Sequence, residues 1–536
     1  MSEPYDTLDK RWKSTCKAIL GQEVGGLDQY MSAISAHTNP IISKKSTMSG
    51  KPVSYLLDFY HPDSKWISLD EIDYNKRYEP IDLEKAKTID SLARMCKDRI
   101  FYSGNVVIGN SDHVLGSSNI MDCFYMLNCT QIGNSKYLTH CTLGRECEDC
   151  FGGNAVAESS ACIRCHETTR DKRSFELWMS QSSSECYYSF GLRNCSDCIF
   201  CFNLRNKRYC VGNAQVSKEE YETVKHRLLE QVVRSLLETH SVPSMYDLIS
   251  KSKQEKLSVP PLPQEKEEKT DKAVVERAFA STCKMVLGQA LGGEMDEYAG
   301  WLMAYIHPTE FVNSCLSGKR IALTHYSNYN ILPHERMVSL EEAYYLGERL
   351  SLDKKDALGL DLANAHEKIG KLVYIASEWS EGKKSNLTDC NIYIDAADCY
   401  RVAGAIYSKS CGYCFWPKSS ENAFGSDTLF VSNACIHCYY STQLTRCFEM
   451  DACSNCSDSM YCHNCENLSD CLFCFNVKGM RYAIGNVVVG RERFMQVKKR
   501  VQEEIVEKLG KERKLQSNIF NVGAVGKIRG EGETHE

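Results

Sequence analysis

The sequence predicts an α+β protein built from two tandem copies of one module. Each copy is expected to hold N-terminal helices, a β-solenoid-like cysteine-rich repeat region and a closing amphipathic helix. The duplication is visible in two places: residues 14–26 return as residues 281–293, and residues 196–203 return as residues 469–476. Cysteines at regular spacing, between turns rich in Asn, Ser, Gly and Asp, predict the repeat region.

Each copy is expected to begin with a helical cap, over residues 1–99 in copy one and 274–370 in copy two. In copy one, apolar residues recur at helical spacing at Leu83, Ala86, Ile89, Leu92 and Ala93. The cysteine-rich β-repeat region and closing helix then occupy residues 100–239 and 371–512.

The closing helices carry the clearest helical patterns in the chain. Ser217 and Glu220 have the spacing of a capping box. The matching apolar stripe of copy two consists of Phe494, Val497, Val501, Ile505 and Leu509. Residues 240–273, with Pro-rich and charged runs, are expected to be a linker, and residues 513–536 a flexible tail.

Cysteines in the second repeat region recur every nine residues, at Cys438, Cys447, Cys456, Cys465 and Cys474. Two nonapeptides would make an eighteen-residue coil in which the same side chain recurs above itself. A protonated thiol is small and apolar and packs well in a core. A row of inward-facing cysteines therefore predicts a stack of packed side chains inside the solenoid, here called the cysteine ladder.

Zinc is the alternative interpretation of the same cysteines, because two Cys-x-x-Cys pairs can form a tetrahedral thiolate cage. The pairs that occur in both copies supply the candidate ligands Cys162, Cys165, Cys198, Cys201, Cys435, Cys438, Cys471 and Cys474. Elsewhere Cys453 and Cys462 align with Ser180 and Ser189, which cannot ligate as thiolates. The ladder is therefore favoured; structural zinc stays open, and no cofactor is required.

Composition, charge and missing motifs argue against several classes of protein. The net charge of −6 excludes a uniformly basic surface, and the chain has no apolar run of membrane-helix length. With 29 cysteines and no secretion signal, a reducing cytoplasmic location and free thiols are expected. Phosphate-loop, nucleophile-elbow and His-Glu-x-x-His motifs are missing, so no catalytic residue is assigned and a non-enzymatic role is expected.

A basic turn near the end of each repeat region is the candidate nucleic-acid contact. Arg205, Lys207 and Arg208 could bind phosphates while Tyr209 stacks on a base. The counterparts in copy two are Lys478, Arg481 and Tyr482. Two such turns on one chain would give bivalent binding.

The string Cys195-Ser-Asp-Cys-Ile-Phe-Cys-Phe-Asn-Leu-Arg-Asn-Lys-Arg-Tyr-Cys-Val-Gly-Asn213, followed by Ser217-Lys-Glu-Glu-Tyr221, resembles a duplicated cysteine-rich repeat family of archaea and candidate-phylum bacteria. Most of that family is uncharacterised. The resemblance covers most of both modules and implies an archaeal source, but no catalytic residue. The chain lacks the N-terminal zinc-ribbon cysteines that some bacterial members carry.

These observations lead to one expected function and two alternatives. The expectation is a binding and bridging protein whose partner is a ribosomal subunit or another ribonucleoprotein, as a stress or dormancy factor would bind. A structural shell or virion assembly protein is one alternative, and a zinc-dependent or thiol-redox enzyme is the other. No membrane partner is expected, and a homodimer is left open.

Overall fold

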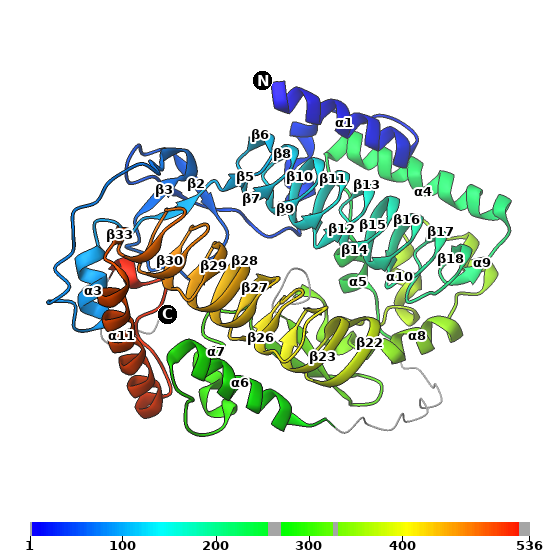
Figure 1. Cartoon of the computed structure of the whole chain (residues 1–536). Coiled ribbons are helices and arrows are strands. Elements are labelled where there is room, and N and C mark those ends of the chain that lie inside the picture. The colour runs from blue at the N-terminus through cyan, green and yellow to red at the C-terminus, as the bar shows by residue number, and fades with distance from the viewer. Residues whose placement is uncertain (1–2, 256–269, 325–330, 525–536) are drawn as a thin grey trace.

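The computed structural model describes residues 3–255, 270–324 and 331–524 and has an α+β fold (Figure 1). Two large, mostly parallel sheets dominate it. Array one, residues 107–215, consists of β5 (Val107–Ile108), β6 (Asp112–Leu115), β7 (Ser118–Met121), β8 (Phe124–Leu127), β9 (Thr130–Gly133), β10 (Lys136–Arg145), β11 (Glu148–Asn154), β12 (Val156–Ala157), β13 (Ser160–Ile163), β14 (His166–Thr169), β15 (Lys172–Gln181), β16 (Ser184–Phe190), β17 (Ser196–Ile199), β18 (Arg208–Val211) and β19 (Ala214–Gln215).

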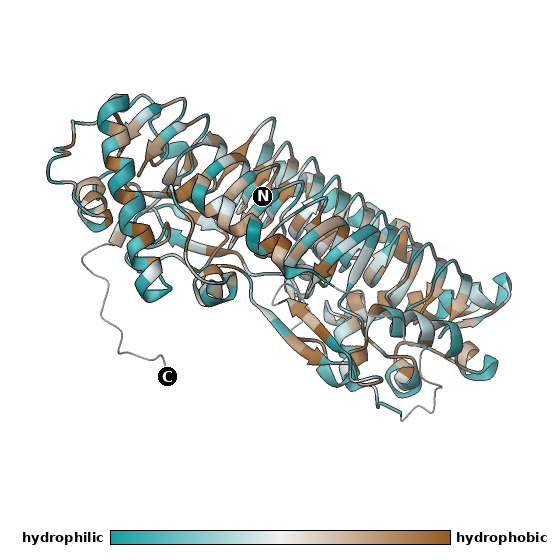
Figure 2. Ribbon diagram, turned by 60° about the horizontal axis from the view of Figure 1, so that its bottom comes forward, coloured by the Kyte–Doolittle hydropathy of each residue, from teal (hydrophilic) through white to brown (hydrophobic). Residues whose placement is uncertain are grey.

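Array two, residues 379–488, has the same plan. It consists of β22 (Trp379–Thr388), β23 (Ile392–Ala403), β24 (Ala405–Ile406), β25 (Gly412–Phe415), β26 (Glu421–Phe424), β27 (Asp427–Phe430), β28 (Asn433–Asp451), β29 (Ser454–Ser457), β30 (Met460–His463), β31 (Ser469–Leu472), β32 (Arg481–Ile484) and β33 (Val487–Val488). Each array ends in an antiparallel pair, β18 with β19 and β32 with β33. Figure 2 shows the strands stacked in rows along the molecule.

Parallel neighbours are offset by twelve residues, except at the start of each array, where the offset is thirteen, as between Val107 and Ile120 and between Trp379 and Ile392. Cys150 lies beside Cys162 in array one, and Leu444 lies beside Cys456 in array two. Residues with positive φ recur every three positions, as at Tyr125, Asn128, Gln131 and Asn134. Each twelve-residue rung is therefore made of four tripeptides, each with one residue in the left-handed region.

The expected eighteen-residue coil is wrong. The nine-residue cysteine spacing spans three tripeptides and returns to an inward position, but not to the same side of the rung. Cys447 Sγ accordingly donates to the carbonyl oxygen of Cys456, at 3.5 Å, whereas the residue stacked on Thr442 is Ser454, twelve positions later. The cysteine spacing correctly predicts which residues face inward. It does not determine how many residues make up one rung.

The interior of each array is a narrow apolar column. In array one it includes Cys150, Cys162, Leu177 and Cys198, and in array two Cys435, Leu444, Cys453 and Cys474, all at most 2% exposed. A buried thiol hydrogen-bonds to nearby backbone: Cys453 Sγ lies 3.3 Å from the Asp451 oxygen and 3.4 Å from that of Cys462.

Helices cover one side of each array. Array one is covered by α1 (Glu3–Leu20) and the closing helix α4 (Lys218–Thr239), and array two by α6 (Lys272–Leu287) and the closing helix α11 (Arg491–Glu512) (Figure 1). The expected capping box of α4 is present, with Ser217 and Glu220 bonded reciprocally. The expected stripe of α11 is buried, from Phe494 to Leu509.

The segment after each closing helix packs into the core, which corrects two expectations. In the expected linker 240–273, α5 (Met245–Lys251) buries Met245, Leu248 and Ile249. In the expected flexible tail 513–536, Ile519, Phe520 and Val522 are at most 1% exposed. The two segments occupy equivalent positions in the two modules. Their burial was not predicted, because each has few apolar residues among many charged ones. Residues 256–269 and 525–536 lie outside the described part.

The remaining segments form two compact units beside the arrays. Cap one, residues 42–104, holds β1 (Ile42–Lys45), β2 (Pro52–Tyr55), β3 (Trp66–Ser68), α3 (Ile89–Cys96) and β4 (Tyr102–Gly104). Cap two, residues 309–376, holds β20 (Thr309–Asn313), β21 (Arg320–Thr324), α8 (Leu340–Arg349), α9 (Lys354–Leu358) and α10 (Ala365–Lys368). The regions expected to be helical caps thus also contain hairpins. Short helices α2 (Met31–Ser35) and α7 (Ala299–Leu302) precede them.

The caps are exchanged between the modules. Val53, Trp66 and Tyr102 of cap one share a buried cluster with Phe473, Phe475 and Ile484 at the end of array two. Reciprocally, Leu323, Met337 and Ile375 of cap two share a cluster with Ile199, Phe202 and Val211 at the end of array one. Each module therefore completes the core of the other.

Candidate functional site

The candidate site in each module is the contact between the last rungs of an array and the exchanged cap. Seam one joins residues 202–213 of array one to cap two, and seam two joins residues 475–486 of array two to cap one. Asn203 Nδ2 donates to the Tyr374 carbonyl oxygen at 2.8 Å, and Asn476 Nδ2 donates to that of Phe101 at 2.7 Å. Both members of each pair are offset by 273 residues, so one contact is built twice.

A glycine of the array lies in close contact with the cap in each seam. Gly212 and Gly485 have φ values of 53° and 54°. The Gly212 carbonyl oxygen accepts from the Leu352 N–H at 2.9 Å, and that of Gly485 accepts from Arg99 Nη1 at 2.6 Å. A Cβ would lie 2.6 Å from Leu352 Cδ1 at Gly212 and 2.6 Å from Cys96 Sγ at Gly485. The short distances rather than the φ values favour glycine here, because non-glycine residues adopt similar φ values throughout both arrays.

The predicted basic turns lie at these seams. Arg205 of seam one forms an ion pair with Glu348 of cap two at 2.6 Å and lies 4.5 Å from the Tyr344 ring centroid. Its counterpart Lys478 pairs with Glu466 at 2.8 Å and lies 4.9 Å from the ring of Tyr74 in cap one. These cations contact the exchanged caps.

The other predicted contact residues also make equivalent contacts in the two modules. Arg208 pairs with Asp197 at 2.9 Å, and Arg481 lies 4.0 Å from Asp470. The Tyr209 ring lies 5.7 Å from Tyr221, and the Tyr482 ring 5.9 Å from Phe494, so both pack on the closing helices.

Much of the predicted positive patch is thus balanced by acidic neighbours. Lys207 is exposed at the turn of seam one. Arg208 and Tyr209 lie in β18, and Arg481 and Tyr482 lie in β32, so these four residues are on strands rather than on a turn. The acidic partners could not be recognised in the sequence, because Glu348 lies in a distant segment.

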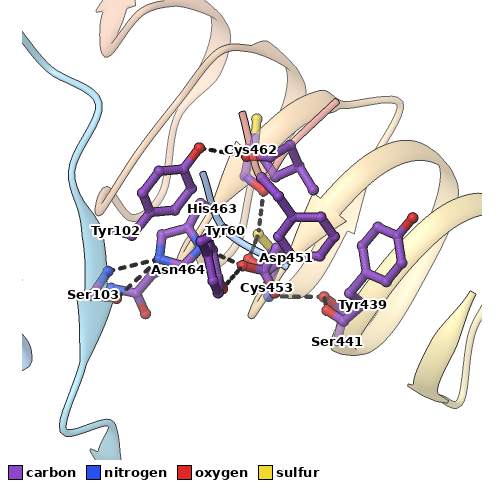
Figure 3. A network of polar contacts seen from close by, with 12 residues as sticks. Tyr60, Tyr102, Ser103, Tyr439, Ser441, Asp451, Cys453, Cys462, His463 and Asn464 are labelled. Atoms are coloured by element: carbon purple, nitrogen blue, oxygen red, sulfur yellow. Dashed lines mark hydrogen bonds and ion pairs between the residues drawn. The ribbon is translucent and has the colours of Figure 1, made fainter. Parts of the chain in front are cut away.

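Seam two also holds a buried polar network that sequence reasoning missed (Figure 3). His463 Nδ1 lies 2.7 Å from Asp451 Oδ2, and Tyr60 of cap one donates to the same carboxylate at 2.5 Å. On the other side of the imidazole, His463 Nε2 accepts from the Ser103 N–H at 2.9 Å. Burial, reinforced by Asp451, raises the pKa of Tyr60 well above its usual value.

Ser103, His463 and Asp451 have the order of a Ser-His-Asp triad, with Ser103 Oγ 3.3 Å from His463 Nε2. However, the three residues are at most 5% exposed, and the Ser103 backbone N–H already occupies the nitrogen that would act as base. The arrangement fits cap docking better than nucleophilic catalysis. His463 follows Asp451 by one rung, a spacing that could have indicated their contact. Array one has Phe190 and Trp178 at these positions.

A buried glutamate in each array holds the segment after the closing helix. Glu176 pairs with Arg164 at 2.6 Å and accepts from the Met245 N–H at 2.7 Å. Glu449 lies 2.8 Å from His437 and accepts from the Ile519 N–H at 2.7 Å. Burial, which outweighs the Arg164 charge, raises the pKa of Glu176 to about 7.

The eight candidate zinc ligands all point into the array interiors and are at most 2% exposed. Burial raises the pKa of the equivalent Cys165 and Cys438 thiols well above the ordinary value, and the adjacent thiols add to this effect. The pKa of the Cys162 thiol is instead lowered, by side-chain hydrogen bonds with Cys150 and Cys165, so the candidate ligands do not share one direction of shift. Among residues 3–255, 270–324 and 331–524, no group of three or more His, Cys, Asp or Glu side chains is placed to hold a metal ion.

Comparison of the chain with protein-family models, curated proteins and solved structures found no match. Within the described part of the chain, none of the helices combines the length and apolarity needed to cross a bilayer.

Proposed function

We propose that this protein is a non-enzymatic, cytoplasmic binding and bridging protein made of two equivalent β-solenoid modules. Its partner is a ribosomal subunit or another ribonucleoprotein, held in pairs as a stress or dormancy factor would hold them. The observation that carries the proposal is the twofold repetition of the seams, in which Asn203 and Asn476 make the same contact 273 residues apart.

The repetition supports bridging because the backbone contacts and the glycine of one seam recur at the other. The exchanged caps lock the two modules together, so the spacing between equivalent surfaces is fixed. Fixed spacing lowers the entropic cost of engaging a second partner site and favours two identical or symmetric targets over a single small ligand.

The proposed contacts with phosphate are Lys207 and the arginines beside it. Arg205 and Arg208 have acidic neighbours, so a phosphate would have to compete with Glu348 and Asp197. Binding should therefore be modest at one seam and gain strength from the second. Each phosphate contact that displaces counterions also makes the affinity depend on salt.

Sedimentation of a cell lysate through a sucrose gradient, with and without nuclease, tests the proposal. Co-migration with ribosomal subunits or larger particles, lost after nuclease, is the expected result. Lys207→Glu should reduce co-migration, while Lys384→Glu, an exposed charge reversal on the first strand of array two, should leave it unchanged. Migration as a free protein in every condition would rule the proposal out.

A further inference from the structure

The cap of neither module covers the C-terminal end of its own array. Cap one ends at Gly104, and array one begins at Val107, so cap one is tied to the first rung of array one. Array one has roughly nine rungs, which at ~4.8 Å each place its last rung about 40 Å from its first. A compact cap tied to the first rung does not reach the last one.

The C-terminal ends nevertheless need covering. At seam one Phe202 and Val211 are fully buried, and at seam two Phe475 and Ile484 are fully buried. These residues share their clusters with the cap of the other module. Without that cap the last rung would expose apolar side chains and unpaired backbone groups, which is the state that repeat proteins avoid by capping.

We propose that the chain is a fused pair of exchanged protomers, in which each half is the obligate binding partner of the other. The interface is the seam, and the partner that fits it is the cap of a second copy of the module. The covalent connection between Glu255 and Thr270 raises the local concentration of the halves but is not needed to hold them together. This inference does not depend on the ribonucleoprotein proposal.

The contacts at each seam are those of a permanent interface. Both seams combine a buried apolar cluster with a hydrogen bond from a buried asparagine, Asn203 or Asn476, to the backbone of the cap. Seam two adds the bond from Tyr60 to Asp451, and seam one adds the bond from Asn213 Nδ2 to the Leu350 carbonyl oxygen at 3.0 Å. Obligate dimers have such core-like interfaces, whereas tethered domains with small polar contacts do not.

The test uses the full chain with a site-specific protease sequence placed between Glu255 and Thr270. A photo-crosslinking phenylalanine analogue replaces Tyr74, whose ring lies 4.9 Å from Lys478 Nζ in the other half. The matched control carries the analogue at Tyr137, whose ring lies 4.5 Å from the guanidinium of Arg11 in the same half.

After cleavage, the protein should elute on native size exclusion as one species with the mass of the intact chain. Irradiation should then join the halves covalently on a denaturing gel for the Tyr74 variant, but not for the Tyr137 control. Two outcomes would overturn the proposal: the halves separate after cleavage, or the Tyr74 analogue crosslinks within its own half.

Discussion

Asn476 donates a hydrogen bond to the carbonyl oxygen of Phe101, a residue 375 positions earlier in the chain. The bond joins array two to the cap of the first module, and Asn203 repeats it in the opposite direction. Two modules linked in this way behave as one body.

Removing the seam asparagine should destabilise the protein. Asn476→Ala leaves the Phe101 carbonyl oxygen without its side-chain donor and should lower the free energy of unfolding by about 1 kcal/mol. Asn203→Ala should have a similar effect. Urea unfolding followed by circular dichroism measures both. The control is Asn455→Ala, which removes an exposed Asn455–Asn467 bond and should change stability by less than about 0.5 kcal/mol. Equal losses at all three positions would contradict a special role for the seams.

A methyl group at Gly485 should loosen cap one. Gly485→Ala combines an unfavourable φ with a Cβ 2.6 Å from Cys96 Sγ, so we expect a loss of about 2–4 kcal/mol. Gly479→Ala separates the two causes, because Gly479 has a φ of 64° and open space around its Cβ position. It should lose only about 1 kcal/mol. Thermal unfolding measures the stability of both variants. Equal losses of stability would show that the contact between Gly485 and Cys96 does not restrict the side chain at position 485.

Thiol reactivity tests the ladder interpretation of the cysteines. Cys315 is exposed and Cys390 is half-buried, whereas every other cysteine is buried. A thiol reagent should therefore modify Cys315 and Cys390 in the folded protein and all 29 cysteines after denaturation. Rapid reaction of Cys165 or Cys438 in the folded state would instead indicate an accessible thiolate and revive the redox alternative.

Metal analysis separates the ladder from a zinc site. If the interior thiols are packing groups, the purified protein should hold no stoichiometric zinc, and a strong chelator should leave its unfolding temperature unchanged. A structural zinc cage would contribute directly to folding. One zinc per chain, together with a fall in unfolding temperature on chelation, would therefore support a cage formed by the Cys-x-x-Cys pairs that occur in both copies.

Stability should fall as the pH rises through the range in which Glu176 titrates. The pKa of Glu176 is raised from 4.5 to about 7 by burial, so the folded state binds its proton more tightly than the unfolded state does. Its contribution is fully present below about pH 4.5 and is lost by about pH 7, with a total of order 3 kcal/mol. Glu176→Gln should flatten this part of the pH dependence of urea unfolding. An unchanged slope in Glu176→Gln would show that the carboxyl group is ionised throughout.

Much of the architecture could be predicted from the sequence. The duplication, the two β-rich regions and the closing helices follow from repeated strings, turn residues and the stripe from Phe494 to Leu509. The rung length did not follow, because inward residues recur every three positions and nine is also a multiple of three. Only backbone pairing such as Cys150 with Cys162 fixes twelve.

The exchange of caps could not be predicted in the same way. The two modules are similar in sequence, so local patterns do not distinguish which array a cap covers. Seam contacts such as Arg205 with Glu348 join residues 143 positions apart in sequence. The basic residues were expected on turns, but Arg208 and Arg481 begin strands β18 and β32, and the acidic neighbour of Arg205 comes from a distant segment. Their proposed role in phosphate binding remains a prediction.

The most direct test of bridging is sedimentation of purified ribosomal subunits mixed with increasing amounts of the purified protein. If the protein bridges subunits, we expect single subunits to convert into pairs that contain one protein chain for every two subunits. Excess protein should reverse the pairing, because each subunit then binds its own protein chain. Subunits that remain single at every ratio, with or without bound protein, would contradict bridging.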